Sequence, residues 1–180
     1  MELFKGRPAD VSGRKEREIG VYDCLDSLNI EYFRVDHEVA MTMEDCKAID
    51  EVLGAVMCKN LFLCNRQKTK FYLLIMPADK PFKTKELSSQ IGSARLSFAS
   101  ADKMLEYLDI NPGAVSVMGL KNDTENDVSF IVDEDLLKDE YIGCHPCVNT
   151  SSLKIKTDDL VNVFLPFTKH TMSVLKLVGE

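Results

Sequence analysis

The sequence VMCKNLFLCNRQKTKFYLLIM, which spans residues 56–76, contains two strongly apolar runs separated by a short polar stretch. The runs cover Val56–Cys64 and Phe71–Met76, and the polar stretch covers Asn65–Thr69. Two apolar runs of strand length, joined by so few polar residues, are typical of antiparallel strands that share a turn. The sequence therefore predicts a β-hairpin near the centre of the chain.

The segments around this hairpin alternate irregularly between helical and extended patterns. Ser12, Thr42, Thr84 and Ser100 are expected to start helices, and Gly54 is expected to end the second one. The order is not a regular strand–helix alternation, so an α+β fold with a mixed, largely antiparallel sheet is predicted. Helices are expected at 12–28, 42–53, 84–92, 100–108 and 158–165, and further strands at 32–35, 96–99, 114–117, 128–132, 153–156 and 172–178.

Length and composition favour one cytoplasmic domain that covers residues 1–180. Hydrophobic residues make up 45% of the chain and charged residues 28%, an ordinary balance for a globular protein. The charged first eighteen residues contain no apolar core of a signal peptide, and no apolar run is long enough to span a membrane. The six cysteines are therefore expected to be reduced and mostly buried.

The charge distribution is uneven along the sequence. The net charge is −7, which argues against broad non-specific binding to nucleic acid. Residues 59–95, however, contain eight basic residues and only two acidic ones. This segment would form either one basic face that binds a polyanion or an ordinary solvated surface, and the sequence favours neither.

Lys59 is the most informative single residue, because it is the only charged residue in the run 55–64. Alternate side chains of a strand share a face, so Lys59 is expected beside Met57, Leu61 and Leu63. Desolvation in such surroundings would lower the pKa of the ammonium group and make it reactive. The alternative is a lysine at a strand end whose ammonium group reaches water, and for an arbitrary lysine this alternative is the commoner one.

A second candidate site is a bent loop at residues 143–147, which read GCHPC. Gly143 and Pro146 would define the bend, and the backbone N–H groups of the loop would hold a carbonyl oxygen. His145 would donate a hydrogen bond or titrate near neutral pH, unless it only stabilises the loop.

The same loop contains a Cys-x-x-Cys pair, formed by Cys144 and Cys147. Such a pair can perform redox chemistry or provide half of a zinc site. Pro146 and the polar residues that follow do not predict a helix after the pair, and Cys58 and Cys64 have poor spacing for a second half-site. We therefore expect no metal ion and no cofactor, with a redox or zinc protein as the minor alternative.

Several stretches together resemble one family, the YbaK and prolyl-tRNA-synthetase-associated editing domains, and within it the freestanding ProX type. The resemblance extends from about residue 21 to the C-terminus. The matching stretches are Lys59–Leu63, Arg95–Ser100, Pro112–Ser116, Gly119–Asp123 and His145–Thr150. The resemblance implies a mixed, largely antiparallel sheet surrounded by helices. It also implies hydrolysis of the ester between a wrong amino acid and the 3′ end of a tRNA, chiefly Ala-tRNA(Pro).

The resemblance also assigns expected roles to residues. Lys59 falls on the family lysine and becomes the candidate catalytic residue. The implied partners are the acceptor end of tRNA(Pro) and prolyl-tRNA synthetase. Alternatives are a Cys-tRNA(Pro) deacylase of the same family and a non-catalytic module that binds tRNA or the synthetase. The expected substrate-binding residues are Asn60, Ser116, Val117, Met118, Gly143, His145 and Pro146.

Overall fold

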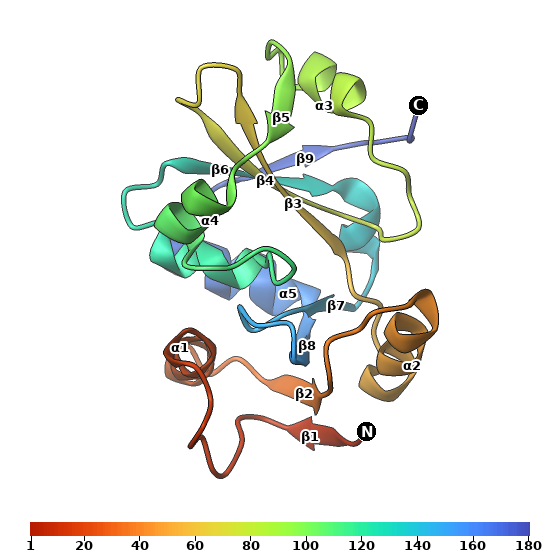
Figure 1. Cartoon of the computed structure of the whole chain (residues 1–180), viewed down its shortest axis with the longest axis vertical. Coiled ribbons are helices and arrows are strands. Elements are labelled where there is room, and N and C mark those ends of the chain that lie inside the picture. Colours follow the sequence, from red (N-terminus) through yellow and green to blue (C-terminus); the bar gives the residue numbers. More distant parts are fainter.

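The computed structural model describes all residues, 1–180, and contains two β-sheets with helices packed around them (Figure 1). One sheet has four antiparallel strands in the order β1 (Leu3–Lys5), β2 (Tyr32–Asp36), β8 (Ser151–Lys156) and β7 (Tyr141–Cys144). The other has five strands in the order β5 (Leu96–Phe98), β3 (Lys59–Asn65), β4 (Phe71–Met76), β6 (Val128–Asp133) and β9 (Met172–Leu175). The predicted α+β class is confirmed, and its strands divide between two sheets.

The predicted central hairpin is confirmed as β3 and β4. These strands pair antiparallel from Lys59 opposite Met76 to Cys64 opposite Phe71. Strand β5 extends the antiparallel part, whereas β4–β6 and β6–β9 are parallel pairs. The five-stranded sheet is therefore mixed, as the irregular order of elements indicates.

Helices lie beside both sheets, and the helical segment near the C-terminus lies between them (Figure 1). In Figure 1, α1 and α2 lie beside the four-stranded sheet, while α3 and α4 lie beside the five-stranded one. A 3-10 helix, η1, connects α4 to β6, and a second, η2, follows β6. A single helical segment near the C-terminus contains α5, a π-helical turn and α6. The bounds are α1 Glu16–Ser27, α2 Met43–Leu53, α3 Thr84–Gln90, α4 Ala101–Leu108, η1 Val117–Asn122, η2 Glu134–Lys138, α5 Thr157–Asp159, the π-helical turn Leu160–Phe164 and α6 Leu165–Thr168.

The predicted start and end of α2 are confirmed. Thr42 and Asp45 form a reciprocal capping box, and Gly54 ends the helix with a φ of 74°. The predicted cap at Ser12 is wrong, because α1 begins after Lys15 and the Ser12 hydroxyl donates to Asp10 instead. A short polar side chain can bond to its own turn as readily as to a helix end.

The predicted strand at 114–117 is also wrong. The Ser116 hydroxyl accepts a hydrogen bond from the backbone N–H of Met118 and starts the 3-10 helix η1 there. Two short strands, β1 and β7, were not predicted. Both are edge strands of three or four residues, and a run that short carries no clear period-two pattern.

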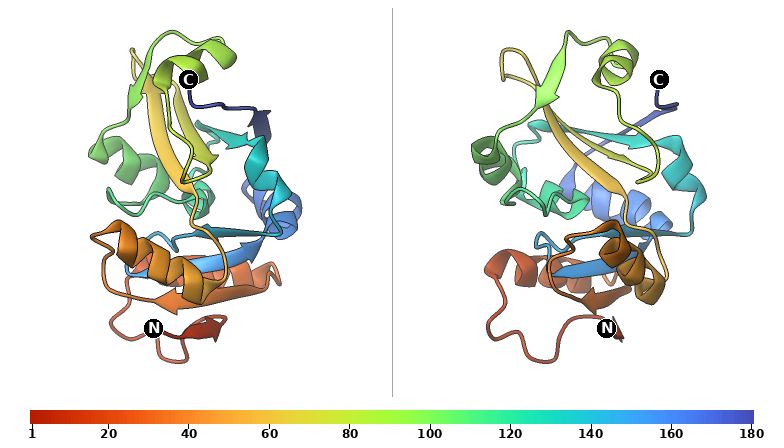
Figure 2. Two further views of the ribbon diagram at one scale, coloured as in Figure 1. Left: turned by 90° about the vertical axis from the view of Figure 1, so that its right-hand side faces the viewer. Right: turned by 45° about the vertical axis from the view of Figure 1, so that its right-hand side comes forward.

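Packing between the sheets and helices produces two apolar clusters. The larger has 30 buried residues and draws on both sheets, on α1 and α4, and on the C-terminal helical segment. The smaller has seven and fills the space between the five-stranded sheet, α3 and the C-terminal residues. Figure 2 shows the two sheets steeply inclined to each other, with α2 near the point where β3 begins. None of the helices combines the length and the apolar character needed to cross a membrane.

Candidate functional site

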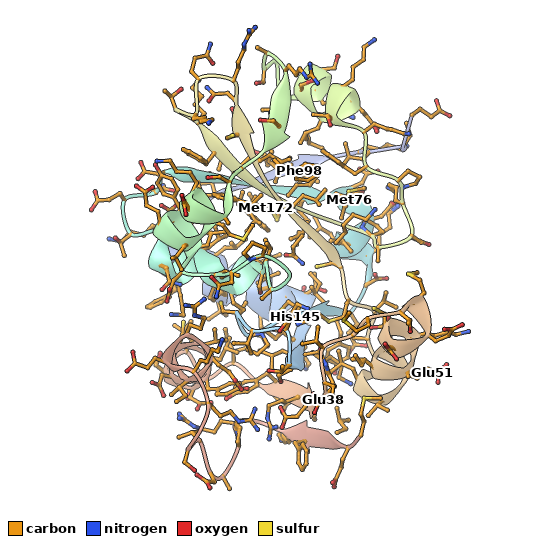
Figure 3. All side chains as sticks on the ribbon, in the orientation of Figure 1. Glu38, Glu51, Met76, Phe98, His145 and Met172 are labelled. Carbon is orange, nitrogen blue, oxygen red and sulfur yellow. The ribbon has the colours of Figure 1, made fainter.

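A pocket of about 420 Å³ lies where four segments meet: residues 37–49 around the start of α2, the start of β3, the loop before η1, and the region between β7 and β8. His145 projects into the middle of the molecule at this junction (Figure 3). Apolar groups form most of the wall, with a few polar groups among them, a composition that suits a small ligand. The lining residues are His37, Val39, Ala40, Cys46, Ile49, Met57, Cys58, Asn60, Gly113, Val115, His145, Asn149 and Ser152.

Asn60 gives this pocket its most unusual feature. Its Nδ2 donates to the carbonyl oxygen of Cys58 at 3.1 Å, while its Oδ1 is buried and has no hydrogen-bond partner. It is the one buried side-chain oxygen or nitrogen without a partner in the chain. An unsatisfied buried acceptor costs about 1–3 kcal/mol. A donor group that reached this oxygen would relieve that cost.

His145 presents a second acceptor. Its Nδ1 lies 2.8 Å from the carbonyl oxygen of Ser151, and a carbonyl only accepts, so Nδ1 carries the proton. Burial lowers the pKa of His145, and the nearby His37 ring lowers it as well, while the bond to the Ser151 carbonyl acts in the opposite direction. The imidazole is consequently neutral near pH 7, with a free Nε2 lone pair.

His37 lines the pocket from the end of β2. Its Nδ1 donates to the carbonyl oxygen of Glu38 at 2.7 Å, so its Nε2 accepts from the Ser152 hydroxyl at 2.8 Å. Both histidines thus have assigned tautomers, each fixed by a backbone carbonyl. From the sequence alone, His37 is expected to form local hydrogen bonds and not to be a catalyst.

The loop after His145 supplies donors. The backbone N–H groups of Cys147, Val148 and Asn149 form no hydrogen bond within the chain, and Cys147 adopts a left-handed φ of 61°. These three residues line a larger polar cavity of about 780 Å³, which shares His37 and Asn149 with the pocket. Successive free N–H groups around a left-handed residue form a concave site for an oxyanion or a phosphate.

Gly143 allows strand β7 to pack closely against the segment that leads into β3. It lies within strand β7, and its carbonyl accepts from the N–H of Cys58 at 3.2 Å. A Cβ at this position would lie 2.9 Å from the carbonyl oxygen of Val56 and 3.0 Å from the sulfur of Met57. Glycine is thus required for β7 to pack against the segment that leads into β3. Gly143 does not line the pocket.

Lys59 and Asn60 occupy adjacent positions at the start of β3, so their side chains point to opposite faces. Asn60 lines the pocket and Lys59 does not. The ammonium group of Lys59 donates to the backbone carbonyl of Lys80 at 2.6 Å. Lys59 shares its face with Leu61 and Leu63, which belong to or pack against the smaller apolar cluster. The structure thus brings Asn60 and His145 together and places the Lys59 ammonium on the other side of the strand.

The remaining predicted site residues lie in the core. Ser116, Val117 and Met118 are at most 1% exposed, and Pro146 is buried. None of the four lines the pocket, whereas Val115 does. The side chain that this segment contributes to the wall is therefore Val115.

The Cys-x-x-Cys pair is also buried. Both thiols are free, and so is Cys58. Burial raises the pKa of Cys58 and Cys147 to about 12 and that of Cys144 still further, so all three remain protonated. Metal binding and thiol–disulfide exchange both need a thiolate. No three His, Cys, Asp or Glu side chains gather in a group that could hold a metal ion.

Sequence reasoning missed most of the pocket wall. His37, Met57, Val115, Asn149 and Ser152 come from four segments that are distant in sequence and meet only in the fold. Val115 directly precedes the predicted site residue Ser116, and Met57 lies two positions before Lys59. This closeness in the sequence is the signal that could have identified them as pocket residues. For His37 and Ser152, no local pattern indicates that β2 and β8 are neighbours.

A small pocket with a neutral imidazole, an unpaired amide oxygen and free N–H groups nearby can bind a small polar ligand and stabilise negative charge that develops on it. Comparisons with known proteins identify the family to which this site belongs. Residues 37–163 match the family described as "Aminoacyl-tRNA editing domain". The chain belongs to this family, and it is a hydrolase of the aminoacyl-tRNA deacylase type.

Two relatives and one solved structure illustrate the similarity. The chain is 33% identical over 139 residues to the prolyl-tRNA editing protein ProX of Acetoanaerobium sticklandii, covering 77% of this chain and 85% of that one. It is 34% identical over 169 residues to prolyl-tRNA synthetase associated domain-containing protein 1 of Danio rerio, covering 93% and 89%. The crystal structure of a candidate trans-editing enzyme for prolyl-tRNA synthetase shares the fold, with a TM-score of 0.66, 15% identity and coverage of 91% and 98%.

Proposed function

We propose that this chain removes wrongly attached amino acids from tRNA(Pro) in trans, with Ala-tRNA(Pro) as its main substrate. The observation that carries the proposal is the unpaired Oδ1 of Asn60 in the same small pocket as the neutral ring of His145. The amino acid of an aminoacyl-tRNA carries a free α-ammonium group beside its ester. Two acceptors without donors of their own are suited to hold that group.

Binding of the α-ammonium group would orient the ester. The Asn60 amide oxygen and the His145 Nε2 lone pair each accept one of its N–H bonds. The side chain of the amino acid then contacts the apolar wall, to which Val115 and Ile49 contribute. The terminal ribose, which carries the ester, then lies at the opening of the pocket.

Hydrolysis of this ester needs no covalent intermediate, because the aminoacyl ester is already activated. Water attacks the carbonyl carbon, and the negative charge that develops on the carbonyl oxygen needs donors. The free N–H groups of Cys147, Val148 and Asn149 supply them in this proposal. Collapse of the tetrahedral intermediate breaks the bond between the acyl carbon and the ribose 3′-oxygen. A proton of the attacking water passes to that oxygen with help from the 2′-hydroxyl, so the free amino acid and a tRNA with a free 3′-hydroxyl are released.

Lys59 acts by its charge in this proposal. Its ammonium group donates to the backbone carbonyl of Lys80 at 2.6 Å. A protonated lysine cannot be a general base. We place its charge at the phosphate or ribose of the terminal nucleotide, reached when the four-carbon side chain leaves the Lys80 carbonyl.

The remaining parts of the proposal concern the setting. Residues 1–180 act as one editing domain, which the single large core shared by both sheets supports. The macromolecular partner is the acceptor end of tRNA(Pro), with prolyl-tRNA synthetase as the enzyme whose errors are corrected. The cytoplasm, where free aminoacyl-tRNA circulates, is the expected location.

The test is the rate of deacylation of purified Ala-tRNA(Pro), Cys-tRNA(Pro) and Pro-tRNA(Pro), measured side by side. We expect Ala-tRNA(Pro) to be hydrolysed fastest and Pro-tRNA(Pro) to survive. Faster hydrolysis of Cys-tRNA(Pro) would assign the cysteine specificity instead. Asn60→Ala should raise KM for Ala-tRNA(Pro) about tenfold, the effect of one lost hydrogen bond to a charged group.

A further inference from the structure

A basic surface of the molecule lies away from the pocket, around α3, β5 and the β3–β4 turn. Six cations are exposed on these elements, and none of them forms an ion pair. Elsewhere, cations such as Arg14, Arg34 and Lys80 are paired with carboxylates. The six are Arg66, Lys68, Lys70, Lys83, Lys85 and Arg95.

The acidic residues of this region do not neutralise the surface. Glu86 is engaged elsewhere, since its carboxylate accepts the backbone N–H groups of Val178 and Gly179. Its role is to hold the C-terminal residues against α3. Six exposed cations therefore face the single carboxylate of α3, and the surface keeps a net positive charge that attracts an external anion.

A groove of about 590 Å³ crosses this surface. Its walls carry two cations, three hydroxyl groups and one exposed aromatic ring. Phe98 is 62% exposed, and the ring of Phe82 lies edge-on to it, with centroids 6.0 Å apart and planes inclined by 60°. Phe98 thus has a supported ring with a face open to solvent. The lining residues are Thr84, Lys85, Ser88, Arg95, Leu96, Ser97 and Phe98.

We propose that this groove, with its surrounding cations, binds the RNA chain of the substrate and stacks one unpaired base on Phe98. The inference rests on the proposed function, because it takes the substrate to be an aminoacyl-tRNA. Cations that track a phosphate backbone, combined with an exposed aromatic ring, are the usual design of a single-strand RNA site. An acidic protein surface would use the cations but would leave the exposed ring and the hydroxyl groups without a role.

The position of the groove relative to Lys59 supports this inference. Phe98 lies directly opposite Leu63 in the β3–β5 pair, and Leu63 shares its strand face with Lys59. Four residues of strand separate Lys59 from Leu63, a distance of about 13 Å. In Figure 3, Phe98 lies in the half of the molecule away from Glu38 and α2. Lys59 and Phe98 therefore lie on the same side of the five-stranded sheet, with Leu61 and Leu63 of the smaller apolar cluster between them.

The test is direct binding of uncharged tRNA(Pro) transcript to the full-length protein over a range of salt concentrations. Lys85→Ala with Arg95→Ala should raise Kd about tenfold or more at low salt, and should reduce the slope of log K against log salt by about 1.4 for two lost single-strand phosphate contacts. Phe98→Ala should raise Kd about tenfold without changing this slope, because stacking involves no counterion release. The matched controls are Lys156→Ala, an exposed unpaired cation of the other sheet, and Phe167→Ala, an exposed aromatic residue of α6.

Deacylation distinguishes this inference from the proposed function. The ratio of kcat/KM for Ala-tRNA(Pro) to kcat/KM for a short alanyl ester of adenosine should fall about tenfold in the Lys85/Arg95 variant. If no aminoacyl-tRNA is hydrolysed but the transcript still binds through the groove, the proposed function fails and the RNA surface stands. If the variants and controls bind the transcript equally, the surface is not an RNA site. If the variants bind the transcript normally but lose binding to prolyl-tRNA synthetase, the groove is a protein-binding surface and not an RNA site.

Discussion

The imidazole rings of His37 and His145 lie 6.4 Å apart and are inclined by 53°, and both line the same pocket. Each ring donates its Nδ1 proton to a backbone carbonyl, of Glu38 and Ser151 respectively. Protonation of one ring would place a positive charge beside the other and beside the bound α-ammonium group. The pocket therefore requires a neutral His145 ring.

Activity should fall at acidic pH for this reason. The pKa of His145 is lowered from its ordinary value of 6.5, so the acid limb of kcat/KM should lie below pH 6.5. The neutral form of His145 also contributes to folding stability. This contribution is complete above pH 6.5 and is lost as the pH falls through the lowered pKa of His145 in the folded protein. His145→Gln should remove the effect of His145 on the acid limb of the kcat/KM profile. It should also lower kcat/KM about tenfold. A pH–rate profile and an NMR titration of His145 check this, and a pKa above 6.5 would contradict it.

Substitution of Lys59 tests whether its charge is needed. Lys59→Ala should reduce deacylation of Ala-tRNA(Pro) at least about 100-fold, the usual effect of removing one electrostatic contact to a transition state. Lys59→Arg should also be poor, because a planar guanidinium does not replace a compact ammonium group. Unfolding curves should match the parent, since the group donates only to a backbone carbonyl. Near-parental turnover of Lys59→Ala would remove this residue from the mechanism.

Gly143→Ala should damage both stability and activity. The added methyl group would lie 2.9 Å from the Val56 carbonyl oxygen and would push the start of β3 away from β7. Such overpacking costs about 1–3 kcal/mol and displaces Asn60 with the strand. Gly20→Ala is the matched control, because there the methyl group meets only the flexible end of Lys121. Denaturant unfolding should show a loss for the first variant and none for the second.

The hairpin and the caps of α2 were predictable because their signals are local. The apolar runs on either side of Asn65 predict β3 and β4, and Thr42 with Asp45 predicts the start of α2. The opposite case is Ser116, whose hydroxyl accepts from the N–H of Met118 and turns an apolar, strand-like segment into a 3-10 helix. One side-chain bond there overrides the pattern of the neighbouring residues.

The candidate site was predicted only in part, for a similar reason. Asn60 belongs to the stretch Lys59–Leu63 and His145 belongs to the loop 143–147, and both residues line the pocket. Strand alternation places Lys59 and Asn60 on opposite faces of β3, but it does not show which face borders the pocket. That depends on where α2 packs, which the sequence does not reveal. The pairing of β2 with β8, which brings Ser152 to His37, is a contact across most of the chain.

The buried cysteines should prove dispensable for catalysis. Cys144→Ala with Cys147→Ala should retain most of the deacylation rate under reducing conditions, because neither protonated thiol has a chemical role in the proposal. The corresponding serine pair should be less stable than the alanine pair, since a hydroxyl buried without a partner costs about 1–3 kcal/mol. Loss of turnover in a folded alanine variant, or stoichiometric zinc in the parent protein, would support the redox or zinc alternative.

Selection against proline should depend on Val115 more than on Met118. A site that hydrolyses Ala-tRNA(Pro) has to spare Pro-tRNA(Pro), and an apolar wall attracts a larger side chain unless it blocks it sterically. Val115 forms part of the wall, whereas Met118 is 1% exposed in the core. Val115→Ala should therefore raise the ratio of Pro-tRNA(Pro) to Ala-tRNA(Pro) deacylation about ten- to a hundredfold, which corresponds to relief of about 1–3 kcal/mol of overpacking. Met118→Ala should instead cost about 2–5 kcal/mol of folding stability, with little change in this ratio. Both ratios are measured at equal fractions of folded protein, and a larger change for Met118→Ala would show that this core residue controls the pocket.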